Sequence, residues 1–194
     1  MAWKRSSVRS RPGPPILPKR TLTRASAKIE VTPATADQEP ILANLLELYT
    51  YDFSEFLHLG PGEDGKFGCF RDLSAYWREP GRYPFLTKVD GNLTGVVLVK
   101  QGSELSGRDA VWDMAEFFVV RGYRRRGIGT QIAQEVWRRF PGAWEVRVME
   151  TNVPARQFWE RAIPEFTGDP IRTVKVEKNG QGWALFSFES RAAE

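Results

Sequence analysis

Cysteine and histidine are almost missing from this chain: one residue of each, Cys69 and His58, occurs among 194 residues. A single cysteine cannot form an intramolecular disulfide, and these two side chains cannot build a multi-cysteine zinc site or a histidine cluster. We therefore expect chemistry without a metal ion and a reducing, cytoplasmic location. Cys69 is expected to be a small buried side chain and not a nucleophile.

Long apolar runs are also missing. No stretch approaches the roughly 18 apolar residues that a membrane-spanning helix requires, although 41% of the residues are hydrophobic. This length and composition suit one domain with a hydrophobic core. We expect a soluble protein with no membrane partner.

Acidic residues are absent from the first 28 positions, which hold eight lysines and arginines. The rest of the chain holds the other 20 basic residues and all 24 acidic ones, so a net charge of +4 combines a basic leader with a mildly acidic remainder. The prolines and the lack of periodicity predict that residues 1–28 are flexible and that residues 29–194 form a single domain. The same prolines oppose the amphipathic helix of a transit peptide, and contact with nucleic acid is the less favoured role.

The segment 111–140 organises the chain. Its pattern predicts an apolar strand over 112–120, a basic connector, a tight turn at Gly127-Ile128-Gly129 and a helix with one apolar face. Glycines allow a ligand to approach the main chain, and the first N–H groups and the dipole of a helix favour negative charge. The segment therefore predicts a site for a phosphate or pyrophosphate.

Three interpretations of this segment compete. A structural glycine turn beside solvated arginines is the simplest. A dinucleotide-binding fingerprint would need a third glycine at Ile132 and a turn directly after the strand. The third fits better: Arg124-x-x-Gly127-x-Gly129, which follows a strand containing Glu116-Phe-Phe-Val119, resembles the R/Q-x-x-G-x-G/A motif of the GNAT superfamily of N-acetyltransferases. In that family the motif holds the pyrophosphate of acetyl-coenzyme A (acetyl-CoA).

A second motif supports the same resemblance. After a strand over 144–149, the sequence Asn152-x-x-Ala155-x-x-Phe-Trp-Glu-Arg161 is similar to the N-x-x-A-x-x-L-Y-E-K segment of the family. The resemblance implies a mixed α/β (α+β) fold, with about seven strands in a central sheet flanked by about four helices. It also implies acetyl-CoA as co-substrate. The coenzyme contacts that it implies are Phe117, Phe118, Val119, Arg124, Arg125, Arg126, Gly127, Ile128, Gly129, Thr130, Asn152 and Trp159.

Trp159 departs from the family pattern, which often has a tyrosine there as general acid. An indole N–H donates a hydrogen bond but does not release its proton near neutral pH. The thiolate would then leave with help from water or from another tyrosine (Tyr123, Tyr49 or Tyr51), or catalysis would be weak.

Glu116 and Asp113 are the candidate general bases. They are three residues apart, so on a regular strand they face opposite sides, but a bulge that is common in this strand of the family would change that parity. Spacing alone does not choose between them. Glu116 lies among apolar residues, which predicts a pKa raised by desolvation, although a structural carboxylate is the alternative.

Helical and strand patterns place the other elements. We expect a strand over 29–31, a helix entered near Pro40, a short helix over 72–79, a hairpin at Asp90-Gly91 and a closing hairpin around 179–182. The closing hairpin, if exposed, could pair two copies in a homodimer. The buried face expected for the first long helix comprises Ile41, Leu42, Leu45, Leu46, Leu48 and Tyr49.

The acceptor is expected near the end of that first helix. Aromatic rings and the carboxylates of residues 49–56 would attract a cationic amine, with Tyr51, Asp52 and Glu55 as substrate-binding residues, unless the rings are core and the acids surface. The favoured function is transfer of an acetyl group by direct attack of a primary amine, from a small cationic molecule or a protein. The alternative is a coenzyme A-binding module with little catalysis that docks through its leader.

Overall fold

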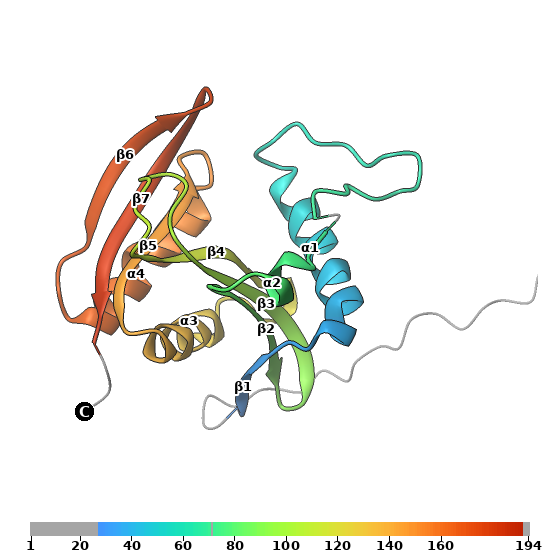
Figure 1. The fold of residues 1–194 in the computed structure, drawn as a ribbon, viewed down its shortest axis with the longest axis horizontal. Coiled ribbons are helices and arrows are strands. Elements are labelled where there is room, and N and C mark those ends of the chain that lie inside the picture. Colours follow the sequence, from blue (N-terminus) through green and yellow to red (C-terminus); the bar gives the residue numbers. More distant parts are fainter. Residues whose placement is uncertain (1–26, 71, 192–194) are drawn as a thin grey trace, which may run out of the picture.

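The computed structural model describes residues 27–70 and 72–191, and it contains the mixed sheet that the family resemblance implied (Figure 1). Seven strands lie in the order β1-β2-β3-β4-β5-β7-β6 within these residues. Their bounds are β1 Ile29–Pro33, β2 Arg82–Val89, β3 Asn92–Gln101, β4 Trp112–Val119, β5 Gly142–Met149, β6 Arg172–Lys178 and β7 Gln181–Ser190. The helices of the described part are α1 Glu39–Phe53, α2 Ala75–Arg78, α3 Ile128–Arg139 and α4 Val153–Thr167, with 3₁₀ turns at Ala36–Gln38 and Arg121–Tyr123.

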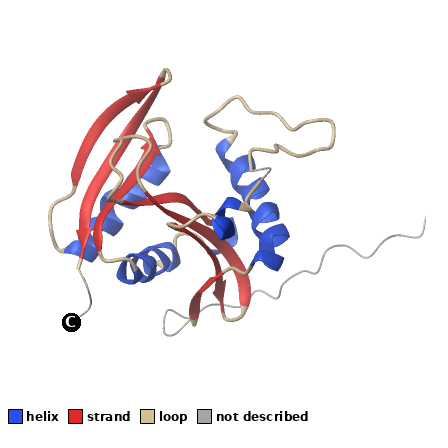
Figure 2. Cartoon of the chain, in the orientation of Figure 1, coloured by secondary structure: helices blue, strands red, loops and turns tan. Residues whose placement is uncertain are grey.

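Helices pack on both faces of the sheet (Figure 2). Alternate side chains of a strand point to opposite faces, so each strand of the centre contributes to two cores. On β4, Met114 and Phe117 join the core under α3 and α4, whereas Phe118 joins the core under α1 and α2. Burial on both faces explains why β3 reads as a nearly continuous apolar run.

Strands β4 and β5 are parallel, but they pair only at their beginnings. The described register joins Trp112 to Trp144 and Asp113 to Glu145, and no further pairs follow. Beyond Asp113, β5 continues to pair with β7 and β4 continues to pair with β3. One edge of β4 is therefore without a strand neighbour from Met114 onward.

Both predicted hairpins are present. Asp90 and Gly91 connect β2 to β3 with φ of +50° and +77°, and Asn179 and Gly180 connect β6 to β7 with φ of +54° and +71°. Two consecutive positive φ values define the tight hairpin turn that Asn-Gly and Asp-Gly favour. Strand β6 lies at the edge of the sheet with most side chains exposed, and the homodimer stays a prediction.

Two local expectations were wrong. Ile41 and Leu48 are 38% and 52% exposed, because only the stripe centred on Leu42, Leu45 and Leu46 faces the sheet. Cys69 is exposed because it lies in the loop between α1 and α2 and not in a packed element. In the described ranges no helix is long and apolar enough to cross a membrane. Apart from Ala27 and Lys28, the leader lies outside the described residues.

Candidate active site

A bulge in β4 brings the two candidate bases to one face. Leu98 of β3 pairs with Glu116, but the next residue, Val99, pairs with Met114, so Ala115 is the extra residue. Asp113 and Glu116 consequently both lie on the face covered by α1 and α2, although three positions separate them. The expected change of parity is thus present, and the two carboxylates belong to one site.

Arg147 of β5 binds both carboxylates. Its Nη1 lies 2.5 Å from Asp113 Oδ2 and its Nη2 lies 3.9 Å from Glu116 Oε1. Lys100 of β3 lies 3.9 Å from Asp113 Oδ2 and also pairs with Glu104. Since Asp113 is 2% exposed and is held by two cations, its carboxylate is committed to the ion-pair network.

Burial raises the pKa of Asp113 above its ordinary value, against the lowering effect of Arg147 and Lys100, and it raises that of Glu116 to near neutrality. Burial brings the pKa of Glu116 to about 7, against the lowering effect of Arg147 and of a hydrogen bond from the Tyr49 hydroxyl. Burial and the Glu116 charge raise the pKa of Tyr49 in turn, so this phenol remains protonated at neutral pH. A carboxyl that titrates near neutrality suits proton transfer, because the ideal pKa of a general base lies near the working pH.

The raised pKa of Glu116 also predicts a pH-dependent stability. Between its ordinary value of 4.5 and about 7, the folded protein keeps a proton that the unfolded chain has released. The folded state binds more protons in this window, so its free energy of unfolding falls as the pH rises. We expect wild type to lose up to about 3 kcal/mol relative to Glu116→Gln between about pH 4.5 and 7.5, measured by urea unfolding. A difference that stays constant across this range would contradict the assignment.

The turn before α3 has the geometry of an anion site. Arg125 and Gly127 have φ of +61° and +75°, and α3 begins at Ile128. The first hydrogen bond at this end of α3 runs from Gln131 N to Gly127 O at 3.2 Å. The N–H groups of residues 128–130 precede it and donate to no acceptor within the described residues.

The packing around Gly129 is tight, and a side chain there would require the Phe158 ring to shift by a few tenths of an ångström. A Cβ there would lie 3.2 Å from Phe158 Cε2 and 3.8 Å from Phe117 Cε1. At Gly127 a Cβ would meet only Gln131 Nε2, at 3.9 Å, but the left-handed φ strongly favours glycine. Glycine is therefore favoured at position 129 by close packing and at position 127 by backbone conformation. At both positions the lack of a side chain leaves main-chain groups accessible.

A comparison with protein families decides the relationship. The model described as "Acetyltransferase (GNAT) family" matches residues 43–163, which is more than half of the chain. The chain belongs to the acetyltransferase (GNAT) family. No curated protein sequence matches the chain significantly.

Solved structures share the fold of this acetyltransferase family member. An acetyltransferase from Thermus thermophilus is 20% identical with a TM-score of 0.58, over 83% of this chain and 96% of that chain. Arabidopsis thaliana NAA60 in complex with a bisubstrate analogue is 20% identical with a TM-score of 0.52, over 84% and 98%. A GNAT family acetyltransferase from Elizabethkingia anophelis with acetyl-CoA bound is 14% identical with a TM-score of 0.52, over 83% and 97%. At these identities the likeness concerns the fold alone.

In this GNAT protein Arg124 connects the anion turn to α1. Its Nε donates to Val119 O at 2.5 Å, its guanidinium carbon lies 5.3 Å from the centre of the Phe118 ring, and it pairs with Asp52. Arg121 also pairs with Asp52, at 2.8 Å. The carboxylate that sequence analysis assigned to the acceptor is thus occupied by two arginines.

The other expected acceptor residues do not gather around Glu116. Tyr51 is 62% exposed, with its ring 6.4 Å from Phe67, and Glu55 is exposed. Tyr49, which the sequence offered only as an alternative proton donor, is the residue of α1 that contacts Glu116. The acceptor roles of Tyr51, Asp52 and Glu55 remain predictions.

Asn152 and Trp159 have structural partners. Asn152 Oδ1 accepts a hydrogen bond from Ala155 N at 3.1 Å and so caps α4. Trp159 is 5% exposed, and its ring lies 5.0 Å from that of Phe117 and 5.9 Å from that of Trp137. Trp159 therefore supports the strand that carries the implied pantetheine contacts, and direct coenzyme contact by either residue remains a prediction.

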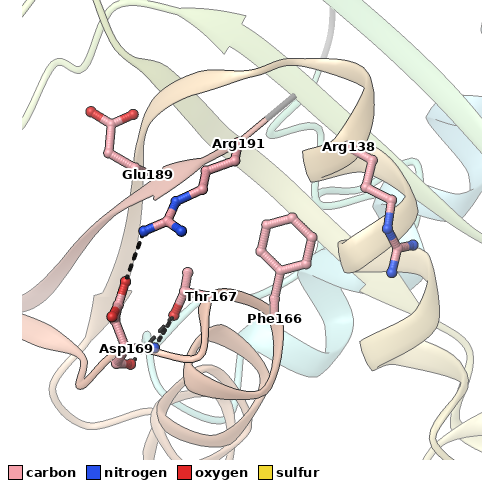
Figure 3. Close-up of a pocket in the computed structure, with 6 residues that line it drawn as sticks. All are labelled: Arg138, Phe166, Thr167, Asp169, Glu189 and Arg191. Atoms are coloured by element: carbon pink, nitrogen blue, oxygen red, sulfur yellow. Dashed lines mark hydrogen bonds and ion pairs between the residues drawn. The ribbon is translucent and has the colours of Figure 1, made fainter. Parts of the chain in front are cut away.

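A cavity of about 200 Å³ lies away from these groups (Figure 3). Its Arg138 belongs to the last turn of α3, about 15 Å along the helix from the anion turn. Arg138 lies over the Phe166 ring, and Arg191 pairs with Asp169 at 3.8 Å. The lining residues are Arg138, Phe166, Thr167, Asp169, Glu189 and Arg191, none of which belongs to the site described above.

Sequence analysis missed Arg147 and Lys100. The available signal was an interruption of apolar strands by charge: Glu145 and Arg147 alternate within β5, and Lys100 follows the apolar run of β3. Period-two alternation places such charges on one face, but only the sheet order shows that this face meets Glu116.

Proposed function

We propose that this GNAT protein transfers an acetyl group from acetyl-CoA to a primary amine by direct attack of the amine. The observation that carries the proposal is Glu116, a shielded carboxyl with a pKa of about 7 on the bulge of β4. The same strand leads through the arginine connector to the anion turn of α3. Strand β4 thus carries the proposed proton acceptor, Glu116, and leads directly to the turn that would bind the pyrophosphate.

The residues present fit acetyl-CoA. The accessible N–H groups at residues 128–130 and the neighbouring Arg125 and Arg126 would hold the pyrophosphate, and the edge of β4 over residues 117–119 would pair with the pantetheine arm. When bound, acetyl-CoA supplies the acetyl group as an activated thioester. Glycine at position 129 supports this fit, because a Cβ there would crowd the Phe158 ring beside the N–H groups of the turn.

Glu116 would take the proton that the amine must lose. With a pKa of about 7 it is substantially ionised at physiological pH and accepts that proton directly or through one water. Tyr49 donates a hydrogen bond to Glu116 and stays protonated, so it would hold the carboxyl in place, and the departing thiolate would take its proton from water in place of a tyrosine at Trp159. Cys69 lies exposed in the α1 to α2 loop and has no part in this proposal.

The charges around Glu116 favour a cationic acceptor. With Glu116 ionised, three carboxylates (Asp113, Glu116 and Glu104) face two cations (Lys100 and Arg147). Lys178 beside Glu104 offsets part of this charge, so the attraction for a protonated amine comes mainly from ionised Glu116 itself. We propose that the acceptor is a small cationic amine or a protein amine and that the protein acts in the cytoplasm.

A second candidate keeps coenzyme binding without efficient chemistry. The observation that favours it is Trp159, which is buried in an aromatic cluster where the family often has a tyrosine. In this case the protein would bind acetyl-CoA without transferring its acetyl group, so no free coenzyme A would form. Its leader, residues 1–28, would mediate docking to a partner.

Turnover assays separate the two candidates. The full chain would be incubated with acetyl-CoA and with polyamines, aminoglycosides, or peptides bearing a free α-amine or lysine, while free coenzyme A thiol is measured. We expect amine-dependent thiol release, together with calorimetric binding of acetyl-CoA but not of NAD. Binding without release for every amine supports the binding module. Absence of acetyl-CoA binding contradicts both candidates.

A further inference from the structure

Arg147 lies where the parallel ladder of β4 and β5 has already ended. It follows Glu145, the last residue of β5 that pairs with β4, by two positions, and it pairs with Leu185 on the other side. Its Nη2 donates to the main-chain oxygen of Ala115 at 3.3 Å. Because Ala115 is the extra residue of the bulge, a side chain supplies the donor that a neighbouring strand would otherwise provide.

The same guanidinium fixes the two carboxylates on either side of the bulge. It binds Asp113 Oδ2 at 2.5 Å and lies 3.9 Å from Glu116 Oε1. The side chain of Arg147 is 22% exposed, so these contacts are largely shielded from water. One planar group thus reaches three acceptors of β4, which the single ammonium of a lysine could not reproduce.

We propose that Arg147 is a positioning residue that replaces the missing strand ladder beside the bulge and holds Glu116 in place for proton transfer. The role rests on the proposed acetyl transfer, since it assigns a function to a residue around the same carboxyl. Arg147 itself need not touch the amine or the thioester. It acts through the backbone at Ala115 and through Glu116.

Arg147 is one of several charged or titratable groups around Glu116. Tyr49 comes from α1, Tyr76 from α2 with Arg82 of β2 beside it, Lys100 from β3, Asp113 from β4, and Glu104 from the loop after β3. Arg147 is the largest influence that lowers the pKa of Glu116 against desolvation. Without it, the pKa of Glu116 should rise above about 7, and the base should be protonated at neutral pH.

The test compares the pH profiles of Arg147→Met, Arg147→Lys and wild type in the full chain. For Arg147→Met we expect kcat at about pH 7 to fall about 100-fold, with partial recovery near about pH 9 and an unchanged KM for acetyl-CoA. Arg147→Lys keeps the positive charge but not the planar guanidinium with its several donors. The midpoint of its kcat–pH profile should therefore stay near that of wild type, while kcat should be intermediate. Arg172→Met on exposed strand β6 is the matched control and should behave as wild type.

A loss of kcat with an unmoved midpoint in Arg147→Met would overturn the proposal, as would full activity in that variant. If Arg147→Met fails to fold, Arg147→Gln takes its place. An upward shift in the midpoint of its kcat–pH profile would support the proposal, and an unmoved midpoint would contradict it. A readout without turnover is the carboxyl titration of Glu116 by ¹³C NMR, assigned through Glu116→Gln. If wild type acetylates no amine, the proposed function fails, whereas an upward NMR shift without Arg147 still supports its placement of Glu116 and no shift refutes it.

Discussion

Replacing Glu116 with glutamine is expected to lower kcat/KM about 100-fold to 1,000-fold at about pH 7.5, the range typical of a lost general base. Glutamine keeps the size of the side chain and can accept the Tyr49 hydrogen bond, but it cannot accept a proton. Acetyl-CoA affinity, measured by calorimetry, should stay close to that of wild type, since the N–H groups of residues 128–130 that would bind the pyrophosphate make no hydrogen bond to Glu116. In wild type, kcat/KM should rise with pH through about 7 as Glu116 loses its proton, and this limb should vanish in the variant.

Two comparisons sharpen this result. Asp113→Asn tests the rival base, because it removes the neighbouring carboxylate while leaving Glu116 in place. Glu177→Gln on exposed strand β6 makes the same chemical change away from the site and should leave kcat/KM unchanged. If Asp113→Asn abolishes the pH-dependent limb and Glu116→Gln keeps it, Asp113 is the base and the present assignment is wrong.

Acetyl-CoA binding should weaken at least about 100-fold in Gly129→Glu, equivalent to about 2.7 kcal/mol. The new Cβ would lie 3.2 Å from Phe158 Cε2, so the side chain must turn toward the open end of the turn. There it places a carboxylate where the N–H groups and the helix dipole favour an anion. Isothermal titration of acetyl-CoA into variant and wild type measures the loss directly.

Gly60→Glu is the matched control for this charge change. Gly60 lies in the loop between α1 and α2, and a Cβ there would meet nothing within 4 Å. This variant should bind acetyl-CoA as wild type does, and circular dichroism should show both variants folded. Undiminished binding by folded Gly129→Glu would remove the anion turn from the coenzyme site.

Local patterns predicted most of the architecture. Alternation predicted the strands, Asp90-Gly91 and Asn179-Gly180 predicted the hairpins, and the glycines before Ile132 predicted a helix entry. Each of these signals depends on neighbours within a few residues, which the sequence displays directly. The two family motifs then implied a mixed central sheet, which local signals do not contain, and the order of its strands came only from the structure.

Contacts between distant segments could not be predicted in the same way. Asp52 appeared free in the sequence, but arginines 69 and 72 residues later bind it. The bulge at Ala115 is a register shift against β3, and the hydrogen bond to its main-chain oxygen comes from Arg147, 32 residues away. Ile41 and Leu48 are apolar enough for a core, but their exposure is set by which stripe of α1 meets the sheet. Tertiary packing decided each of these points.

The pairing of Asp52 with Arg121 and Arg124 has a thermodynamic consequence. It joins α1, whose Tyr49 reaches Glu116, to the turn that would hold the pyrophosphate. Any acceptor that displaces α1 on binding must also change the free energy of that turn. Linkage then requires reciprocity: the factor by which acetyl-CoA alters acceptor affinity equals the factor by which the acceptor alters acetyl-CoA affinity. In Asp52→Asn, both affinity ratios should approach a value of one, and they should change by the same amount.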